Sequence, residues 1–196
     1  MEERLQKQLD FILEIDKIKQ INRQTYLADG SRKENDAEHS WHLAVMCLLL
    51  AEHSNQEIDI LKTMAMVLIH DVIEIDAGDT YAYDEVANAT KAEREKKAAE
   101  RLYSLLPDDQ GAYLKALWEE FEEKKTKEAL FANALDKVQP ILLNVASSGR
   151  AWREHDVCAS QVLNRNKLTP EGSQDLWGYC LRLIEKNVEL GNLRNE

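Results

Sequence analysis

The chain has few of the residues that interrupt regular structure. Its 196 residues include seven glycines and three prolines. No low-complexity segment, internal repeat or Pro/Ser-rich linker separates one part of the chain from another. We therefore predict one domain over residues 1–196, long enough to bury a substantial core.

The chain also lacks a basic excess and long apolar runs. Asp and Glu number 36 against 25 Lys and Arg, a formal net charge of -11. This balance argues against a partner such as a nucleic-acid polymer, whose backbone requires a basic face, and against a basic membrane-surface helix. The stretches "AVMCLLLA" and "MAMVLI" are too short to span a bilayer. The N-terminus "MEERLQKQLD" lacks the apolar region of a signal peptide.

Cysteine is scarce as well. Cys47, Cys158 and Cys180 are odd in number and lack CxxC spacing. They are typical of reduced thiols rather than of a disulfide framework or a zinc site. A cytoplasmic location is expected.

Most of the chain shows the apolar periodicity of helices. Apolar residues recur at helical spacing from Glu2 to about Ile21, and "NRQTYLADGSRKEN" then reads as a loop. Asp36 is a plausible N-cap for a helix through "AEHSWHLAVMCLLLAEH". A third helix is expected from about Glu57 to Ile75. It is apolar nearly all round, and its expected inner stripe consists of Leu61, Met64, Ala65, Leu68 and Val72.

Gly78 is expected to end that element. Further helices are predicted from about Asp84 to Leu106, closed by Pro107, and then over "DDQGAYLKALWEEFEEK" and "KEALFANALDKVQPILLNVAS". The C-terminal part offers one or two more. The predicted fold is all-α, a bundle of roughly six to nine helices with no credible strand pair.

The stretch "LIHDVIEIDAGDTYAYDE" carries the first chemical signal. No Lys or Arg occurs between Lys62 and Lys91. In the helical interpretation His70 and Glu74 share one face, with Asp71 adjacent. Carboxylates among Leu, Ile and Val cost several kcal/mol each without a partner, and a divalent cation is the simplest compensating charge. The alternative is a satisfied core histidine with a solvated acidic rim, and this stretch alone favours neither.

Two distant segments add candidates. His39 falls in the first turn of its helix, from which its side chain is expected to reach outward. His42 is better interpreted as a packing or supporting residue. Asp136 lies in an apolar helical run, where Pro140 cannot donate to its carbonyl, so the helix is expected to loosen or kink there. The alternative for Asp136 is a surface pair with Lys137.

"AEHSW", "HDVIEIDAGD" and "NALDK", in this order and at these separations, resemble the HD-domain metal-dependent phosphohydrolase superfamily. The resemblance is closest to the branch of bacterial 5'-deoxyribonucleotidases and HD-domain-containing nucleotidases, and it covers roughly residues 10 to 165. It implies an HD-domain helical bundle whose metal-binding core spans about 10–165, followed by C-terminal helices.

The resemblance implies that one divalent metal ion is bound by His39, His70, Asp71 and Asp136. Two imidazoles and two carboxylates leave positions open for water and a substrate oxygen. The two carboxylates among these four ligands favour Mn, Co, Mg or Ni over a tetrahedral Zn site. Di-iron relatives use additional histidines, so a single metal ion is expected here.

The resemblance also assigns roles around the metal. Glu74 matches the residue that orients or deprotonates the attacking water, and Asp79 an acid that holds the sugar or a water near the phosphate. Arg23 matches the phosphate-contacting arginine, with a surface arginine as the alternative. The aromatic residue that often follows this arginine is absent in "NRQTY", so Tyr26 or Trp41 is considered for packing against base or sugar.

The implied function is hydrolysis of a nucleotide, a (deoxy)ribonucleoside 5'-monophosphate and first of all a deoxyribonucleoside one, to nucleoside and phosphate by a homodimeric enzyme. Two alternatives remain open. One is an HD hydrolase acting on a triphosphate, a cyclic nucleotide or an alarmone. The other is a non-catalytic, metal-stabilised nucleotide-binding module, against which the presence of Glu74 and Asp79 argues. Asp76, Asp84 and Glu85 are expected to form a solvated rim.

Overall fold

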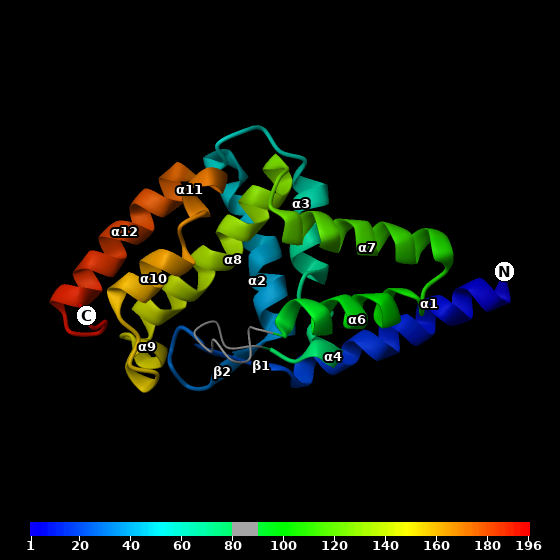
Figure 1. Ribbon diagram of the computed structural model, residues 1–196, viewed down its shortest axis with the longest axis horizontal. Coiled ribbons are helices and arrows are strands. Elements are labelled where there is room, and N and C mark those ends of the chain that lie inside the picture. The colour runs from blue at the N-terminus through cyan, green and yellow to red at the C-terminus, as the bar shows by residue number, and fades with distance from the viewer. Residues whose placement is uncertain (80–89) are drawn as a thin grey trace.

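Helices account for most of the computed structural model, which describes residues 1–79 and 90–196 (Figure 1). In the described ranges seven α-helices have ten residues or more, which confirms the predicted all-α bundle. These are α1 (Glu2–Ile15), α2 (Asp36–Leu50), α3 (Ile60–Ile69), α6 (Lys91–Tyr103), α7 (Asp108–Glu123), α8 (Lys127–Ala146) and α12 (Gln174–Glu189). The shorter elements are η1 (Asp16–Gln20), η2 (Ala51–His53), α4 (Glu74–Ala77), α9 (Arg150–Glu154), α10 (Ala159–Arg165) and α11 (Thr169–Gly172).

Helix α8 is the centre of the fold. It packs against α2, α3, α7, α11 and α12, and Figure 1 shows it crossing the middle of the molecule in front of α2. Phe131 and Leu135 of α8 are fully buried with Leu43 of α2 and Met66 and Val67 of α3. Burying side chains of this size contributes about 1.5–3 kcal/mol each. The main core therefore joins helices that are far apart in sequence.

A second apolar cluster holds the N-terminal end of the chain. Phe11 of α1 packs with Ile73, Ala99, Tyr103 and Trp118. Figure 1 shows α1 running beneath α6 toward the N-terminus at one end of the long axis, with α12 near the other end. This cluster positions the turn after α3, which carries His70 and Asp71.

The segment expected to be a loop contains a strand pair, so the prediction of no strand pair is wrong. β1 (Asn22–Tyr26) and β2 (Lys33–Asn35) are antiparallel. In the turn between them Leu27 N donates to Arg32 O at 2.9 Å, and Gly30 adopts a φ of 70°. Positive φ is inexpensive only for glycine. Such a short hairpin has too few positions for a period-2 pattern to be recognised.

Helix α2 begins at Asp36, so its N-cap lies one residue earlier than predicted. Asn35, not Asp36, is the N-cap. Its side chain accepts from Glu38 N at 2.9 Å, and Glu38 Oε2 accepts from Asn35 N at 3.1 Å, which forms a capping box. Asp36 is therefore free of the capping role, and its buried side chain points to Arg23 instead.

The third predicted helix is interrupted at the HD pair. α3 ends at Ile69, a turn follows, and Glu74 begins α4, which ends at Ala77 before Gly78 as expected. His70 and Glu74 therefore do not share a face of one continuous helix.

The expected inner stripe of this helix is wrong at two of its five positions. Val72 is buried, and Met64 and Ala65 pack against the main core. Thr63, Met66 and Val67 are buried, whereas Leu61 and Leu68 are exposed. A helix that is apolar all round carries no periodic signal for its inner side.

The remaining helices follow the prediction more closely. α7 and α8 match the predicted segments, and α8 continues through Pro140 as far as Ala146. Of the helix predicted from Asp84, residues 84–89 lie outside the described residues, and α6 begins at Lys91. In the described part of the chain no helix is long and apolar enough to cross a membrane.

Candidate metal and phosphate site

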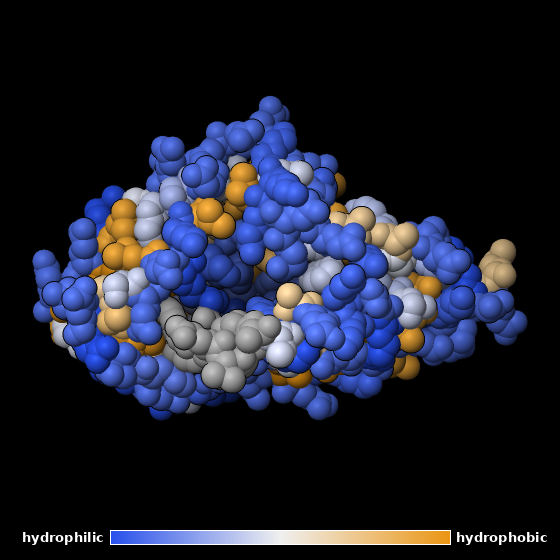
Figure 2. Space-filling model, viewed as in Figure 1, coloured by the Kyte–Doolittle hydropathy of each residue, from blue (hydrophilic) through white to orange (hydrophobic). Residues whose placement is uncertain are grey.

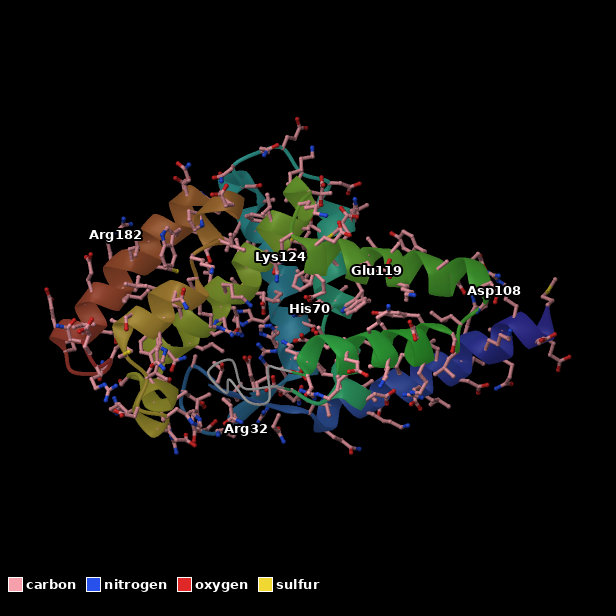
Figure 3. All side chains as sticks on the ribbon, viewed as in Figure 1. Arg32, His70, Asp108, Glu119, Lys124 and Arg182 are labelled. Carbon is pink, nitrogen blue, oxygen red and sulfur yellow. The ribbon has the colours of Figure 1, made fainter. Side chains whose placement is uncertain are left out.

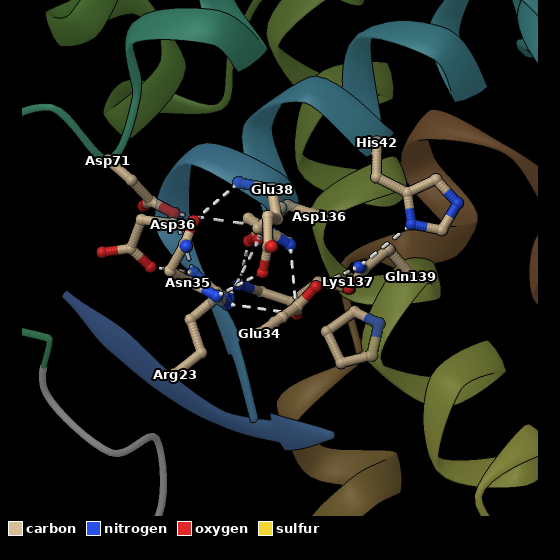
Figure 4. Close-up of polar contacts among 12 residues, drawn as sticks. Arg23, Glu34, Asn35, Asp36, Glu38, His42, Asp71, Asp136, Lys137 and Gln139 are labelled. Carbon is tan, nitrogen blue, oxygen red and sulfur yellow. Dashed lines mark hydrogen bonds and ion pairs between the residues drawn. The ribbon is translucent and has the colours of Figure 1, made fainter. Parts of the chain in front are cut away.

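Four elements bring the predicted site residues together. β1 supplies Arg23, the first turn of α2 supplies His39, the turn after α3 supplies His70 and Asp71, and α8 supplies Asp136. Figure 4 shows Arg23, Asp36, Asp71 and Asp136 converging, and Figure 3 places His70 near the centre of the molecule. The expectation that His39 reaches outward is wrong, because its side chain is fully buried among these elements.

The two histidines face the carboxylates through their Nε2 atoms. His39 Nε2 lies 3.0 Å from Asp136 Oδ1, and His70 Nε2 lies 3.1 Å from Asp71 Oδ1 and 3.8 Å from Asp136 Oδ1. His70 Nδ1 donates to Val67 O at 2.9 Å. A carbonyl only accepts, so Nδ1 carries the hydrogen and Nε2 is directed into the cluster.

Arg23 is enclosed by acids. Its guanidinium lies 2.7 Å from Asp71 Oδ2 and 3.3 Å from Asp36 Oδ1, with Glu34 Oε1 at 3.6 Å and Asp136 Oδ1 at 3.9 Å. Burial by itself lowers the pKa of Arg23, but the charges of Asp71, Asp136, Asp36 and Glu74 raise it overall. Arg23 thus acts as a counter-ion to the site's own carboxylates.

Asp136 is both buried and paired with its neighbour. Lys137 Nζ lies 2.6 Å from Asp136 Oδ2. Burial raises the pKa of Asp136, but Lys137, His39 and His70 hold it well below its usual range. Burial and the cation Arg165 lower the pKa of Lys137 despite Asp136. The alternative pairing of Asp136 with Lys137 is therefore present, but the pair lies inside the site rather than on the surface.

Glu74 lies in a markedly acidic environment. Burial first, and then the charges of Asp71, Asp36 and Asp79, raise its pKa to about 11. Burial and Asp71 also raise the pKa of Asp36 to about 7, and its carboxyl group is a hydrogen-bonding neighbour of Glu74. Within the chain alone Glu74 therefore retains a proton at neutral pH. A nearby bound cation would lower this pKa.

Two buried polar residues, Glu34 and Gln139, and the half-buried His42 support the cluster from behind. Gln139 Nε2 donates to Glu34 Oε2 at 2.9 Å and lies 3.3 Å from His42 Nδ1. His42 is thus a supporting residue, as expected. Glu34 and Gln139 were not predicted, although Gln139 follows Asp136 at i+3 and so shares its helix face.

Three adjoining cavities open around this cluster, and Figure 2 shows a hollow near the middle of this face with largely hydrophilic walls. The central cavity, about 110 Å³, is lined by His70, Asp71, Glu74, Asp79 and Asp136 among others. The side cavity, about 90 Å³, shares Arg23 and Asp79 with it and adds Ile141, Asn144 and Trp152. A third, the cationic cavity, is lined by Lys124, Lys137 and Arg165 together with Leu130, Asn133 and Thr169.

Other predicted residues lie elsewhere. Trp41 is 64% exposed on α2 and lines none of these three cavities, so the structure offers no support for a substrate contact. Tyr26 stacks under the Arg150 guanidinium, 4.2 Å from its ring centroid. Asp76 is an exposed carboxylate that accepts a hydrogen bond from Arg101. Asp84 and Glu85 lie outside the described residues.

The cluster fits a metal ion. Within the described residues His39, His70 and Asp136 each offer a ligand atom, and these atoms lie within 4.8 Å of one another. The buried His70 Nε2 faces Asp71 Oδ1 at 3.1 Å and Asp136 Oδ1 at 3.8 Å but makes no well-aligned hydrogen bond with any described residue. Asp71 lies beside them but bonds to Arg23. A cation would satisfy the imidazole nitrogen and offset the buried carboxylate charge.

Residues 15–177 match the family model described as HD domain. The 5'-deoxynucleotidase HDDC2 of Bos taurus is 32% identical over 136 residues, covering 68% of this chain and 64% of the relative. That of Dictyostelium discoideum is 30% identical over 140 residues, covering 68% and 74%. The chain thus spans 64% of the length of its bovine relative.

A crystal structure of a predicted metal-dependent phosphohydrolase from Magnetospirillum magnetotacticum is 48% identical, with a TM-score of 0.93, covering 97% of this chain and 95% of that one. A conserved hypothetical protein from Pyrococcus furiosus is 26% identical, with a TM-score of 0.62, covering 92% and 99%. With the family model matching most of the chain and the cluster built from the "AEHSW", "HD" and "LDK" segments, this protein belongs to the HD domain family.

Proposed function

We propose that this protein is a metal-dependent phosphohydrolase that converts deoxyribonucleoside 5'-monophosphates to nucleosides and phosphate. The observation that carries the proposal is the convergence of His70, Asp71 and Asp136 in the wall of a cavity that Glu74 and Asp79 also line. The name 5'-deoxynucleotidase of the HDDC2 relatives supports this activity, and the name of the Magnetospirillum structure supports a metal-dependent phosphohydrolase.

His39, His70, Asp71 and Asp136 would hold one divalent cation, for which Mn, Co, Mg, Ni and Zn are all candidates. Bound there, it would supply polarisation of a phosphoryl oxygen and a lower pKa of water. His70 must lose the proton on Nε2 before it can bind a cation. Burial lowers its pKa, but Asp71 and Asp136 raise it to about 10, so a proton competes for Nε2 with the cation.

The chain's own acids would manage protons and orientation. Glu74 lies in the central cavity, and its Oε2 has no hydrogen-bond partner, so it can exchange a proton with a water or a leaving oxygen there. Asp79 lies at the junction of the central and side cavities, where a sugar hydroxyl would meet it. Arg23 holds Asp71 and Asp36 in place and borders the same junction.

The side cavity is the proposed place for the nucleoside. Ile141 and Trp152 offer apolar contacts, and Asn144 and Gln24 offer hydrogen bonds. The Oδ1 atom of Asn144 is buried without a hydrogen-bond partner. A buried acceptor without a partner suits recognition of a donor on the ligand.

Phosphate release from a panel of mono-, tri- and cyclic nucleotides tests the proposal, with Mn, Co, Mg and EDTA compared. Turnover is expected for deoxyribonucleoside 5'-monophosphates, lost with EDTA. Glu74→Gln should retain metal and lose at least about 100-fold in kcat. Asp76→Asn, which removes an acid outside the cavities, is the control and should leave kcat unchanged. Metal binding without turnover of any nucleotide would instead identify a binding module.

We further propose a homodimer formed through α2 and α3, which pack against each other. Their outer faces expose Trp41, Leu48, Leu49, Leu61 and Leu68. A second copy fits, because the exposed apolar side chains let two chains of like net charge bury surface against each other. Sedimentation should show a dimer that Leu49→Glu dissociates. Leu190→Glu, equally exposed beyond α12, should not. A wild-type monomer would refute the proposal.

We also propose that the protein resides in the cytoplasm. Its three cysteines are free thiols in the structure, which suits a reducing compartment. Cell fractionation should recover it with cytoplasmic markers, and recovery with an oxidising compartment would contradict the proposal.

A further inference from the structure

Three cations gather beside the candidate metal site of an otherwise acidic protein. Lys124, at the end of α7, Lys137 on α8 and Arg165, the last residue of α10, all line both the central cavity and the cationic cavity. Figure 3 places Lys124 close to His70, in agreement with their shared cavity. The two cavities therefore have a common cationic wall.

Two of the three cations in this wall form no ion pair with the described residues. Among the residues that the structure describes, no carboxylate lines the cationic cavity. Lys137 pairs with Asp136, whereas neither Lys124 nor Arg165 forms an ion pair with any described residue. In the same chain Arg23 is surrounded by four carboxylates. Arg165 and Lys124 are thus the cations of this region with charge available for a ligand.

The backbone at Lys124 supports a role beyond the fold. Lys124 ends α7 in the left-handed conformation, with φ 54° and ψ 40°. Glycine is the usual residue at such a helix end, because a side chain there is strained. Strained positions cluster at ligand-binding sites. The chain keeps a lysine here, and its side chain lines both cavities.

We propose that Lys124, Lys137 and Arg165 form a second phosphoryl-binding subsite next to the metal site. One phosphoryl group of a ligand would lie in the central cavity, and a second group linked to it would lie in the cationic cavity. The ligand class is a compound with two linked phosphoryl groups, such as a nucleoside diphosphate. The inference rests on the proposed function in one respect, because that function identifies the central cavity as the site of the first phosphoryl group.

Equilibrium binding of two matched probes tests the subsite without turnover. Methylphosphonate has one phosphoryl group and methylenediphosphonate has two that cannot be hydrolysed apart. Calorimetry of the metal-loaded, full-length protein at constant free Mg²⁺ should show the diphosphonate binding at least about 10-fold more tightly. This ratio should fall to about 2-fold or less in both Lys124→Met and Arg165→Met, since either removes one of two unpaired charges.

Two further variants separate charge from folding. Lys125→Met removes the neighbouring lysine, which is exposed and pairs with Glu123, and should leave the ratio unchanged. Lys124→Gly should abolish the preference while keeping or raising the Tm, because glycine relieves the left-handed strain. Equal binding of both probes by the wild type, or a ratio retained in Lys124→Met or Arg165→Met, would overturn the subsite. Methylphosphonate binding without nucleotide turnover would overturn only the proposed function.

Discussion

The two buried faces of α8 differ in what their side chains require. One face carries Phe131, Leu135 and Val138, which pack in the main apolar core. The other carries Asp136 and Gln139, which are equally hidden from solvent but depend on His39, Lys137 and Glu34. An apolar side chain accepts any apolar neighbour, whereas a buried carboxylate needs particular donors. Partners, rather than burial, distinguish this site from the core.

Replacement of Asp136 should have the largest effect. Asp136→Asn keeps the side-chain shape but removes the charge that a cation and two imidazoles require. We expect metal content to fall to a small fraction of the wild-type value and kcat/KM to fall about 1000-fold or more. Metal analysis by mass spectrometry and initial rates measure this. Unchanged metal stoichiometry would show that Asp136 is not a ligand.

The adjacent residue should behave in the opposite way. Leu135→Ala leaves a cavity in the core and should lower the free energy of unfolding by about 2–5 kcal/mol. Urea denaturation in EDTA measures this without a contribution from bound metal. Metal stoichiometry at low temperature should stay at the wild-type value. A loss of metal equal to that of Asp136→Asn would mean that metal binding depends on the packing of the apolar core of α8.

A smaller effect concerns pH and Glu74. Burial and neighbouring acids raise the pKa of Glu74 from 4.5 to about 11 in the fold. The folded chain keeps this proton while the unfolded chain releases it, so stability from this group falls as pH rises above 4.5. We therefore compare the free energies of unfolding of Glu74→Gln and the wild type in EDTA. The difference in favour of Glu74→Gln should grow by at least about 1 kcal/mol as the pH rises from 5 to 8. Parallel stability curves would contradict the raised pKa.

Much of the helical architecture was predictable because long helices have repeated local signals. α7 and α8 carry periodic apolar residues over many turns, and their predicted segments are confirmed. Gly78 terminates α4 through its positive φ. The hairpin of β1 and β2 escaped prediction because it is only a few residues long. The inner side of α3 escaped it because apolar residues surround that helix.

The site was predictable only in part. His39, His70, Asp71 and Asp136 stand out by residue type and by their resemblance to a known arrangement, and the structure brings them together. Glu34, Gln139, Lys124 and Arg165 carry no comparable signal, since each is an ordinary polar residue of a helix or strand when taken alone. Asp36 was assigned to capping, although its partner is Arg23 across the fold.

Residue type and local periodicity were sufficient to predict the helical class, the acidic balance and the set of side chains able to bind a cation. Three features depend on the packing of the helices: His39 turns inward, Arg23 is neutralised by the chain's own acids, and Lys124 and Arg165, which are distant in sequence, face one cavity. Such long-range pairing depends on how the helices pack around α8, and no local pattern encodes it.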